Sequence, residues 1–262
     1  MVEPTKDTLL GFISEQHVYL QFMVSMLNAV LHPRVTRVAF VEGGPQIHQH
    51  RNALNHAFMD GPEEYLLTVD TDVAFAPEML DELHTTLAQY PDAGGVSGLL
   101  MSSISYGIGN GYMLLGGEWD GEPGAAPTWS SLKAVPEDVL PDACAGAGFM
   151  LLRKSALKDL GDYPFDPIPF EKEGDFRMTS PTRVMAEDVA FLYRMRQAGH
   201  PLVLDPKVRP IHLKTIALRV NEGLKDAGPL EDTTQKLWTP GSDNLAPNVV
   251  PMNRAARRRL KQ

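Results

Sequence analysis

Cysteine is almost absent from this sequence: Cys144 is the only one among its 262 residues. A single thiol excludes an intramolecular disulfide and any zinc site built from several cysteines, and it fits a reducing compartment. Long hydrophobic runs are lacking too. The most apolar stretch, residues 18–31, is interrupted by Gln21, Ser25 and Asn28 and is too short to span a bilayer. We therefore expect a cytoplasmic protein without a membrane span.

Positive charge is also scarce. Lys and Arg number 24 against 33 Asp and Glu, which gives a formal net charge of −9 at pH 7. Such a balance repels nucleic acid and anionic membrane surfaces, so we expect neither as a partner of the protein's body. The exception is a basic C-terminal tail that could touch nucleic acid, formed by Arg254, Arg257, Arg258, Arg259 and Lys261. The N-terminus, with Glu3, Lys6 and Asp7, does not resemble a signal peptide.

Short apolar runs and helical patterns alternate over the first hundred residues. The runs that we expect to form strands are residues 9–13, 37–41, 65–69 and 96–100. Segments with the apolar period of an amphipathic helix lie between them, and this alternation predicts βαβ units with a parallel sheet. We therefore predict an α/β fold with a mixed, mostly parallel sheet and flanking helices, in which ligands bind at the carboxyl ends of the strands.

The pattern changes beyond residue 100. Residues 102–141 are rich in Gly, Ser, Trp and Tyr and have no helical period, which predicts hairpins or loops. Residues 161–183 contain four prolines and are typical of a long loop. Periodicity is lost after about residue 220. We therefore predict one domain over residues 1–220 and an irregular extension with a basic end over residues 221–262.

Two aspartates separated by one residue follow the third apolar run. Asp70 and Asp72 would close a buried strand, where side chains two residues apart point to the same side. Two carboxylates at such a strand end, with no basic neighbour in sequence, make an oxygen-rich site that suits Mg²⁺ or Mn²⁺. The alternative is a solvated turn before the next helix.

Two glycines stand out in the segment 143–152, which we predict to form one buried strand. Gly146 and Gly148 would weaken such a strand unless a ligand or another backbone must approach closely. Small residues at this place would leave room for a sugar or a diphosphate. Tight packing between strands explains them equally well.

An acidic pair and a histidine complete the candidate site. Glu187 and Asp188 open a predicted helix, where the helix dipole favours acidic residues without any further role. His212 ends a predicted strand, and a single histidine in that position is usually structural.

The order of these motifs resembles that of the GT-A glycosyltransferases, and most closely the compact family-2-like enzymes of bacteria and their phages. The shared order is Asp-x-Asp after the third strand, a small-residue Gly-x-Gly segment, Glu-Asp at a helix start and a histidine about 25 residues later. The Arg51-Asn52 pair before the Asp-x-Asp strand also matches. The resemblance covers residues 9–214.

The resemblance implies a nucleotide-sugar donor, with UDP as the expected nucleotide, and Mn²⁺ or Mg²⁺ as cofactor. Three residues match positions around the metal ion: Asp70, beside the ribose or the ion, Asp72 and His212. The positions matched to donor binding are Phe12, Ser14, Arg51, Asp70, Gly146 and Gly148. Phe12 to Ser14 would flank the base, and Arg51 would approach the nucleotide.

On the acceptor side, the resemblance implies roles for the acidic pair and for the proline-rich loop. Glu187 and Asp188 match the catalytic pair that faces the acceptor, and Asp188 would be the base of an inverting reaction. Phe170 and Glu171 match a flexible loop beside the acceptor.

We therefore expect a metal-dependent glycosyltransferase that moves a sugar from a nucleotide-diphosphate donor to a hydroxyl group. The chemistry agrees, because breaking a sugar–diphosphate bond builds negative charge that a protein of net charge −9 cannot stabilise without a local cation. One alternative is a sugar nucleotidyltransferase, but residues 13–17 lack the glycine and basic residues of its phosphate loop. Another is a GT-A-like binding module without catalysis.

Overall fold

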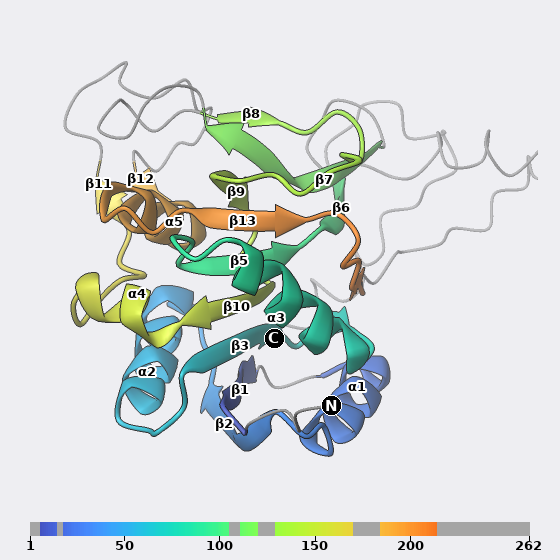
Figure 1. The fold of residues 1–262 in the computed structure, drawn as a ribbon, viewed down its shortest axis with the longest axis vertical. Coiled ribbons are helices and arrows are strands. Elements are labelled where there is room, and N and C mark those ends of the chain that lie inside the picture. Colours follow the sequence, from blue (N-terminus) through green and yellow to red (C-terminus); the bar gives the residue numbers. More distant parts are fainter. Residues whose placement is uncertain (1–5, 15–17, 105–110, 120–128, 170–183, 214–262) are drawn as a thin grey trace, which may run out of the picture. The chain divides into compact units, whose positions relative to one another are not determined.

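The computed structural model describes residues 6–14, 18–104, 111–119, 129–169 and 184–213 (Figure 1). The chain divides into two compact units. The first consists of residues 1–102 and 113–214, and the second of residues 103–112 and 215–262. The central sheet and all the helices described below belong to the first unit. The predicted extension over residues 221–262 lies outside the described residues and stays a prediction.

A six-stranded mixed sheet forms the centre of the first unit, in the order β13-β5-β10-β3-β1-β2. Its strands are β1 (Thr8–Ser14), β2 (Val35–Glu42), β3 (Tyr65–Asp70), β5 (Gly95–Gly98), β10 (Phe149–Arg153) and β13 (Leu202–Asp205). Strand β1 runs parallel to β2 and β3, and β13 runs parallel to β5. Strand β10 is antiparallel to both of its neighbours. The predicted α/β fold with a mostly parallel sheet is confirmed.

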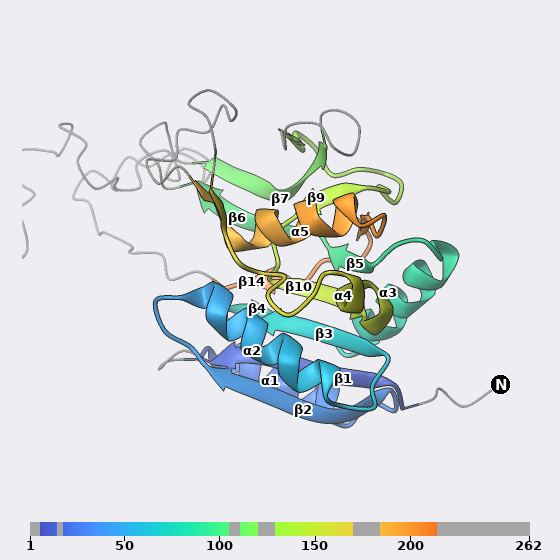
Figure 2. The same ribbon diagram turned by 90° about the vertical axis from the view of Figure 1, so that its left-hand side faces the viewer.

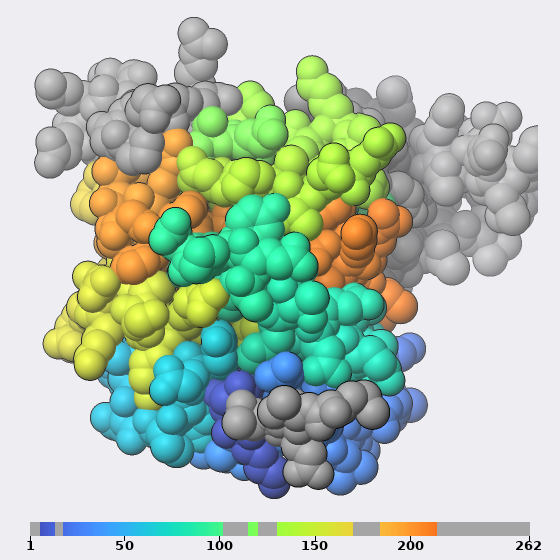
Figure 3. Space-filling model, viewed as in Figure 1, coloured from blue at the N-terminus to red at the C-terminus, as the bar shows by residue number. Residues whose placement is uncertain are grey.

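Helices cover both faces of this sheet (Figures 1 and 2). They are α1 (Leu20–Val30), α2 (Ile47–Met59), α3 (Glu78–Gln89), α4 (Lys154–Asp159) and α5 (Glu187–Gln197). Alternate residues of the strands point to opposite faces, as the pleat requires. Leu10 and Leu67 pack in one core with α1 and α3, whereas Leu9 and Leu66 pack in the other with α2, α4 and α5. Helix α3 hides much of the sheet from one side (Figure 3).

No helix in the described part of the chain is both long enough and apolar enough to cross a bilayer.

Short strands outside the central sheet pair mostly in antiparallel fashion. They are β4 (Val73–Ala74), β6 (Leu100–Ile104), β7 (Gly111–Trp119), β8 (Trp129–Ser131), β9 (Ala143–Ala145), β11 (Ile168–Pro169), β12 (Val184–Met185) and β14 (Ile211–His212). Strand β7 pairs with β8 and β9, β4 with β14, and β11 with β12. Residues 102–141, for which we predicted hairpins or loops, thus contain the antiparallel pair of β7 and β8.

The prediction of one strand over residues 143–152 is wrong. The chain forms β9, which pairs with β7, and then β10, which enters the central sheet between β3 and β5. Gly146 and Gly148 lie in the turn between these two strands rather than inside one. A switch from one sheet to another depends on pairing with distant segments, which local apolar pattern does not reveal.

Gly95 marks a close approach between central strands. A Cβ atom built on Gly95 would lie 2.8 Å from the Leu151 carbonyl oxygen of β10. A carbonyl in a paired strand cannot move without disturbing the ladder. A Cβ on Gly146, by contrast, would meet Leu115 at an ordinary 3.6 Å.

We therefore expect Gly95→Ala to lower the free energy of unfolding by about 1–3 kcal/mol. The matched change Gly146→Ala should leave it nearly unchanged. Urea unfolding of both variants and the wild type at pH 7.5 measures the difference. Equal stability of the two variants would contradict the close approach between β5 and β10.

Candidate active site

The candidate site begins where β3 ends. Asp70 is the last residue of β3, and its backbone N–H donates a hydrogen bond to the Gly148 carbonyl oxygen (2.9 Å). A Cβ atom on Gly148 would lie 3.2 Å from Asp70 Oδ2 and 3.0 Å from Leu100 Cδ1. A side chain at position 148 would therefore press on the Asp70 carboxylate. Glycine here is explained by the close approach of this carboxylate to the β9–β10 turn.

Arg51 of α2 reaches the same place from the other side and is only 3% exposed. Its Nη2 donates to Asp70 Oδ1 (3.0 Å), and its Nη1 donates to the Ala147 carbonyl oxygen (3.4 Å). Its Nε lies 3.9 Å from Glu187 Oε1 and, among the described residues, has no hydrogen-bond partner. One buried guanidinium thus connects α2, β3, the β9–β10 turn and α5.

The acidic pair lies in the first turn of α5, next to this guanidinium. Burial raises the pKa of Glu187, and the charge of Asp188 raises it further, although Arg51 acts in the opposite direction. Burial also raises the pKa of Asp188, although its Oδ1 accepts a hydrogen bond from the Val189 N–H (2.7 Å). Burial alone would lower the pKa of Arg51, but the carboxylates of Asp70, Glu187 and Asp188 outweigh it and raise that pKa. The positive charge of Arg51 therefore interacts with three carboxylates, those of Asp70, Glu187 and Asp188.

Asp72 and His212 form a second pair beyond the end of β3. His212 belongs to β14, which pairs with β4, and its Nε2 lies 3.0 Å from Asp72 Oδ2. The other ring nitrogen, Nδ1, lies 3.0 Å from the Met101 carbonyl oxygen. A carbonyl only accepts, so Nδ1 carries the hydrogen of this bond. Nε2 is then the ring nitrogen that faces the Asp72 carboxylate.

This donor set fits a divalent cation in two respects. Histidines that ligate metals usually donate their second ring N–H to a carbonyl or carboxylate, as His212 does to Met101. Adjacent ligands of an octahedral ion at about 2.1 Å are about 3.0 Å apart. The Asp72–His212 separation of 3.0 Å is compatible with that edge, and it is also the length of an ordinary hydrogen bond.

The predicted set of three metal ligands is not assembled in the part of the chain that the structure describes. Asp72 and His212 lie together, whereas Asp70 is paired with Arg51. Among the described residues, no group of three or more His, Cys, Asp or Glu side chains is arranged to hold a metal ion.

Of the remaining predicted site residues, two lie on β1 and two lie outside the described residues. Phe12 is partly buried between Phe22 (ring centroids 5.4 Å apart) and Phe40 (5.9 Å). Ser14 is the last residue of β1. Phe170 and Glu171 lie outside the described residues.

Two features of this site were not predicted from the sequence. One is the burial of Arg51 against Asp70; its predicted approach to a nucleotide stays a prediction. A signal existed, because Arg51 shares the buried face of α2 with Leu54 and Phe58, three and seven residues later. The Met101 carbonyl that fixes the His212 ring is a backbone group, and no pattern of residue types indicates it.

Comparison with known proteins supports the fold. No protein-family model and no curated protein sequence matches this chain. A197 from STIV aligns with 82% of this chain and 98% of its own, at 12% identity and a TM-score of 0.46. GalNAc-T7 with UDP, GalNAc and Mn²⁺ aligns with 81% of this chain at 11% identity and a TM-score of 0.50, and the chain spans 44% of that protein. At this identity the likeness shows a GT-A-like fold alone. Neither structure bears on the family-2-like resemblance.

The buried charge cluster predicts a stability change that depends on pH. Replacement of Arg51 by Leu leaves three carboxylates without their cation, and we expect the free energy of unfolding at pH 7.5 to fall by about 3–5 kcal/mol. Because the native pKa values of Glu187 and Asp188 are raised, the native state binds more protons than the unfolded state above pH 4. The loss of unfolding free energy in Arg51→Leu should therefore be smaller at pH 5 than at pH 7.5. Urea unfolding of the variant and the wild type between these two pH values measures this difference.

The double variant Arg51→Leu, Asp70→Asn is the matched control, because it removes one of the uncompensated charges. It should recover part of the stability at pH 7.5. An equal loss at pH 7.5 and pH 5, with no recovery in the double variant, would show that Arg51 acts by packing rather than by charge.

Proposed function

We propose that this protein is a metal-dependent glycosyltransferase that moves a sugar from a nucleotide-diphosphate donor, with UDP as the expected nucleotide, to an acceptor hydroxyl. The observation that carries the proposal is the Asp72–His212 pair, whose ring orientation is fixed by the Met101 carbonyl. This pair lies just beyond the end of β3 in a GT-A-like fold, where α/β sheets bind ligands.

Asp72 and His212 would hold Mn²⁺ or Mg²⁺ through Oδ2 and Nε2. The bound ion would neutralise the charge that develops on the nucleoside diphosphate as it leaves. Asp70 is held by Arg51, so its carboxylate is fixed in one orientation at the strand end. We assign Asp70 to the donor, together with the backbone around Gly146 and Gly148. The finer assignment to family-2-like enzymes belongs to this proposal too.

The acidic pair supplies the proton acceptor. Burial raises the pKa values of both Glu187 and Asp188, which brings a carboxylate closer to the pKa that suits a general base near neutral pH. We assign the base of an inverting reaction to Asp188 and a supporting role to Glu187. Cys144 lies near Asp188, but burial raises the pKa of its thiol, which keeps it protonated and makes it a poor nucleophile.

Metal binding can be tested without any sugar. We expect Mn²⁺ with UDP to raise the melting temperature by roughly 5 °C at a hundredfold excess over Kd. Asp72→Asn and His212→Ala should abolish the rise, because each removes one ligand. Thermal unfolding followed by circular dichroism measures it.

The matched control is Asp159→Asn. Asp159 pairs with His200 at 2.7 Å, so the chain contains a second His–Asp contact that lies elsewhere. This variant should keep the full Mn²⁺ shift. Absence of a shift in the wild type, or an equal loss in Asp159→Asn, would contradict the metal site.

The reaction itself can be tested by UDP release from a panel of UDP-glucose, UDP-galactose, UDP-GlcNAc and UDP-GalNAc. We expect Mn²⁺-dependent hydrolysis of at least one donor. Asp188→Asn should lower the rate by about 100-fold or more, since a positioned base contributes about that much. Asp159→Asn again serves as the control. Release of pyrophosphate from UTP and a sugar 1-phosphate, with no UDP release from the panel, would favour a sugar nucleotidyltransferase, and no reaction in either assay would favour a binding module.

A further inference from the structure

Helix α1 carries apolar side chains on two opposite sides. Phe22, Met26 and Ala29 pack in the core beneath the helix. Six further apolar residues face solvent, and at about 100° per residue they fall within an arc of about 120° on the other side. We call these six the α1 stripe: Leu20, Met23, Val24, Leu27, Val30 and Leu31. Apolar side chains on all sides are typical of a buried helix, so this stripe is a surface suited to an interaction partner.

An exposed aromatic ring lies on the same side of the central sheet. Phe40 belongs to β2, the last strand of the sheet, and is 68% exposed. Its ring stacks on Phe12 (centroids 5.9 Å apart), and Phe12 meets Phe22 of α1 edge-on (5.4 Å). Phe40 thus extends the exposed apolar surface on the α1 side of the sheet.

The size of this surface is that of a protein–protein interface. Leu20, Leu27 and Leu31 are 76%, 65% and 82% exposed. With Phe40 and the rest of the α1 stripe they present on the order of 800 Å² to solvent, about what each partner contributes to a stable complex. The largest apolar patch of a typical monomer is only about 300–600 Å². In the described part of the chain, this surface is left uncovered.

The absence of charge favours a second copy of this chain as the partner. Helix α1 contains no charged residue, and its exposed polar side chains are Gln21 and Asn28. Helices that lie on anionic membranes carry Lys and Arg beside their apolar face, which α1 does not. Two copies of a protein with a net charge of −9 repel each other, so a surface without charge is where they can approach most closely.

The order of residues along the α1 stripe also fits a two-fold axis. In a symmetric dimer every contact between two positions occurs twice, once in each direction. When two α1 helices cross antiparallel at the middle of the stripe, Leu20 meets the partner's Leu31. Val24 then meets the partner's Leu27. Each pair joins uncharged side chains of similar size, a condition that an unrelated partner would not impose on the stripe.

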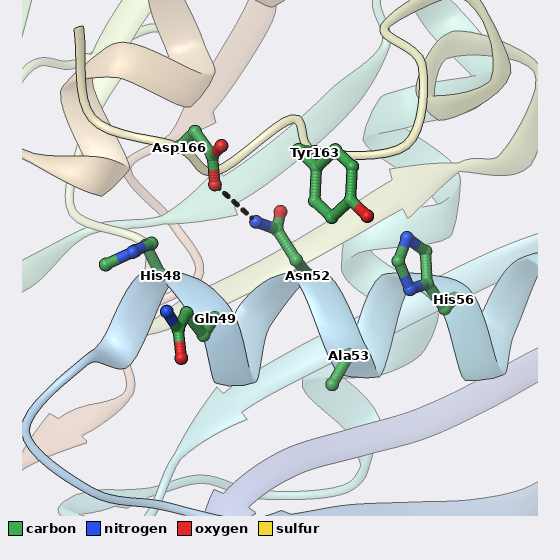
Figure 4. Close-up of a pocket in the computed structure, with 7 residues that line it drawn as sticks. All are labelled: His48, Gln49, Asn52, Ala53, His56, Tyr163 and Asp166. Atoms are coloured by element: carbon green, nitrogen blue, oxygen red, sulfur yellow. Dashed lines mark hydrogen bonds between the residues drawn. The ribbon is translucent and has the colours of Figure 1, made fainter.

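We propose that this protein forms a symmetric homodimer in which the α1 stripes of two copies pack against each other in antiparallel orientation. Helix α2 packs on the opposite face of the sheet and stays outside this interface. A cavity of about 420 Å³ lies beside α2, lined in part by Asn52, His56 and Tyr163 (Figure 4), and the dimer leaves it accessible. The dimer does not depend on the proposed enzymatic activity.

Sedimentation velocity of the full chain between about 1 and about 100 μM tests the assembly. We expect a shift from monomer to dimer as the concentration rises. Leu27→Glu should weaken the dimer at least about 100-fold, because the two-fold axis places two unpaired carboxylates in the interface.

The matched control is Tyr163→Glu. Tyr163 is 60% exposed, close to the 65% of Leu27, and lies beside α2 on the other face of the sheet (Figure 4). This variant should dimerise like the wild type. Both substitutions are at exposed positions, so circular dichroism should show that both variants remain folded.

A pair of opposite charges tests whether the partner is a second copy in the proposed register. Val24→Lys should weaken the dimer as Leu27→Glu does. A mixture of the two variants should dimerise at least about tenfold more tightly than either variant alone, because the introduced ammonium and carboxylate groups then face each other across the axis. The other contact between Val24 and Leu27 is unchanged in the mixed dimer. Native mass spectrometry identifies this dimer by its mass.

Three results would overturn the proposal. One is a wild type that stays monomeric up to about 100 μM, and flotation of that monomer with phosphatidylcholine vesicles would assign the α1 stripe to lipid instead. Another is a dimer that Leu27→Glu and Tyr163→Glu weaken equally or not at all. The third is a mixture of Val24→Lys and Leu27→Glu that dimerises no better than the separate variants.

Discussion

The buried guanidinium of Arg51 is the interaction on which the candidate site depends. It contacts the Asp70 carboxylate and the Ala147 carbonyl, and it lies beside Glu187. These partners come from β3, from the β9–β10 turn and from α5, three segments that are far apart in sequence. A charge at this depth is stable only while its partners remain in place. Arg51 therefore fixes the positions of these segments relative to α2, and with them the geometry of the site.

The same guanidinium sets the charge of its surroundings. One cation among three carboxylates leaves an excess of negative charge, and burial holds the pKa values of Glu187 and Asp188 above their ordinary range. A group with such a pKa takes up a proton near neutral pH more readily than an exposed carboxylate does. The buried cluster that holds the strand ends together therefore also contains the two carboxylates to which we assign the proposed base and its supporting role.

The sequence predicted the parts of this structure that depend on local pattern. The apolar runs at residues 9–13, 37–41 and 65–69 form β1, β2 and β3, because each run carries its own strand propensity and burial. The sheet switch at Gly146–Gly148 was missed, since it depends on pairing with β7 and β3. Asp72 and His212 are 140 residues apart, and they were predicted to lie together only because the order of motifs resembles that of the GT-A glycosyltransferases. The burial of Arg51 could have been inferred from its apolar helix face.

Three metal ligands were predicted and two of them lie together, and this difference bears on the mechanism that we propose. Mg²⁺ in proteins is commonly held by one or two carboxylates together with substrate phosphates, and it keeps several waters. In the proposed site, Asp72 and His212 alone would leave most coordination positions to the diphosphate and to water. Such a site would bind the ion weakly alone and more tightly with the donor, because the donor supplies the missing oxygens. Asp70, the third predicted ligand, is paired with Arg51 instead. This pairing orients the Asp70 carboxylate whether or not an ion is bound.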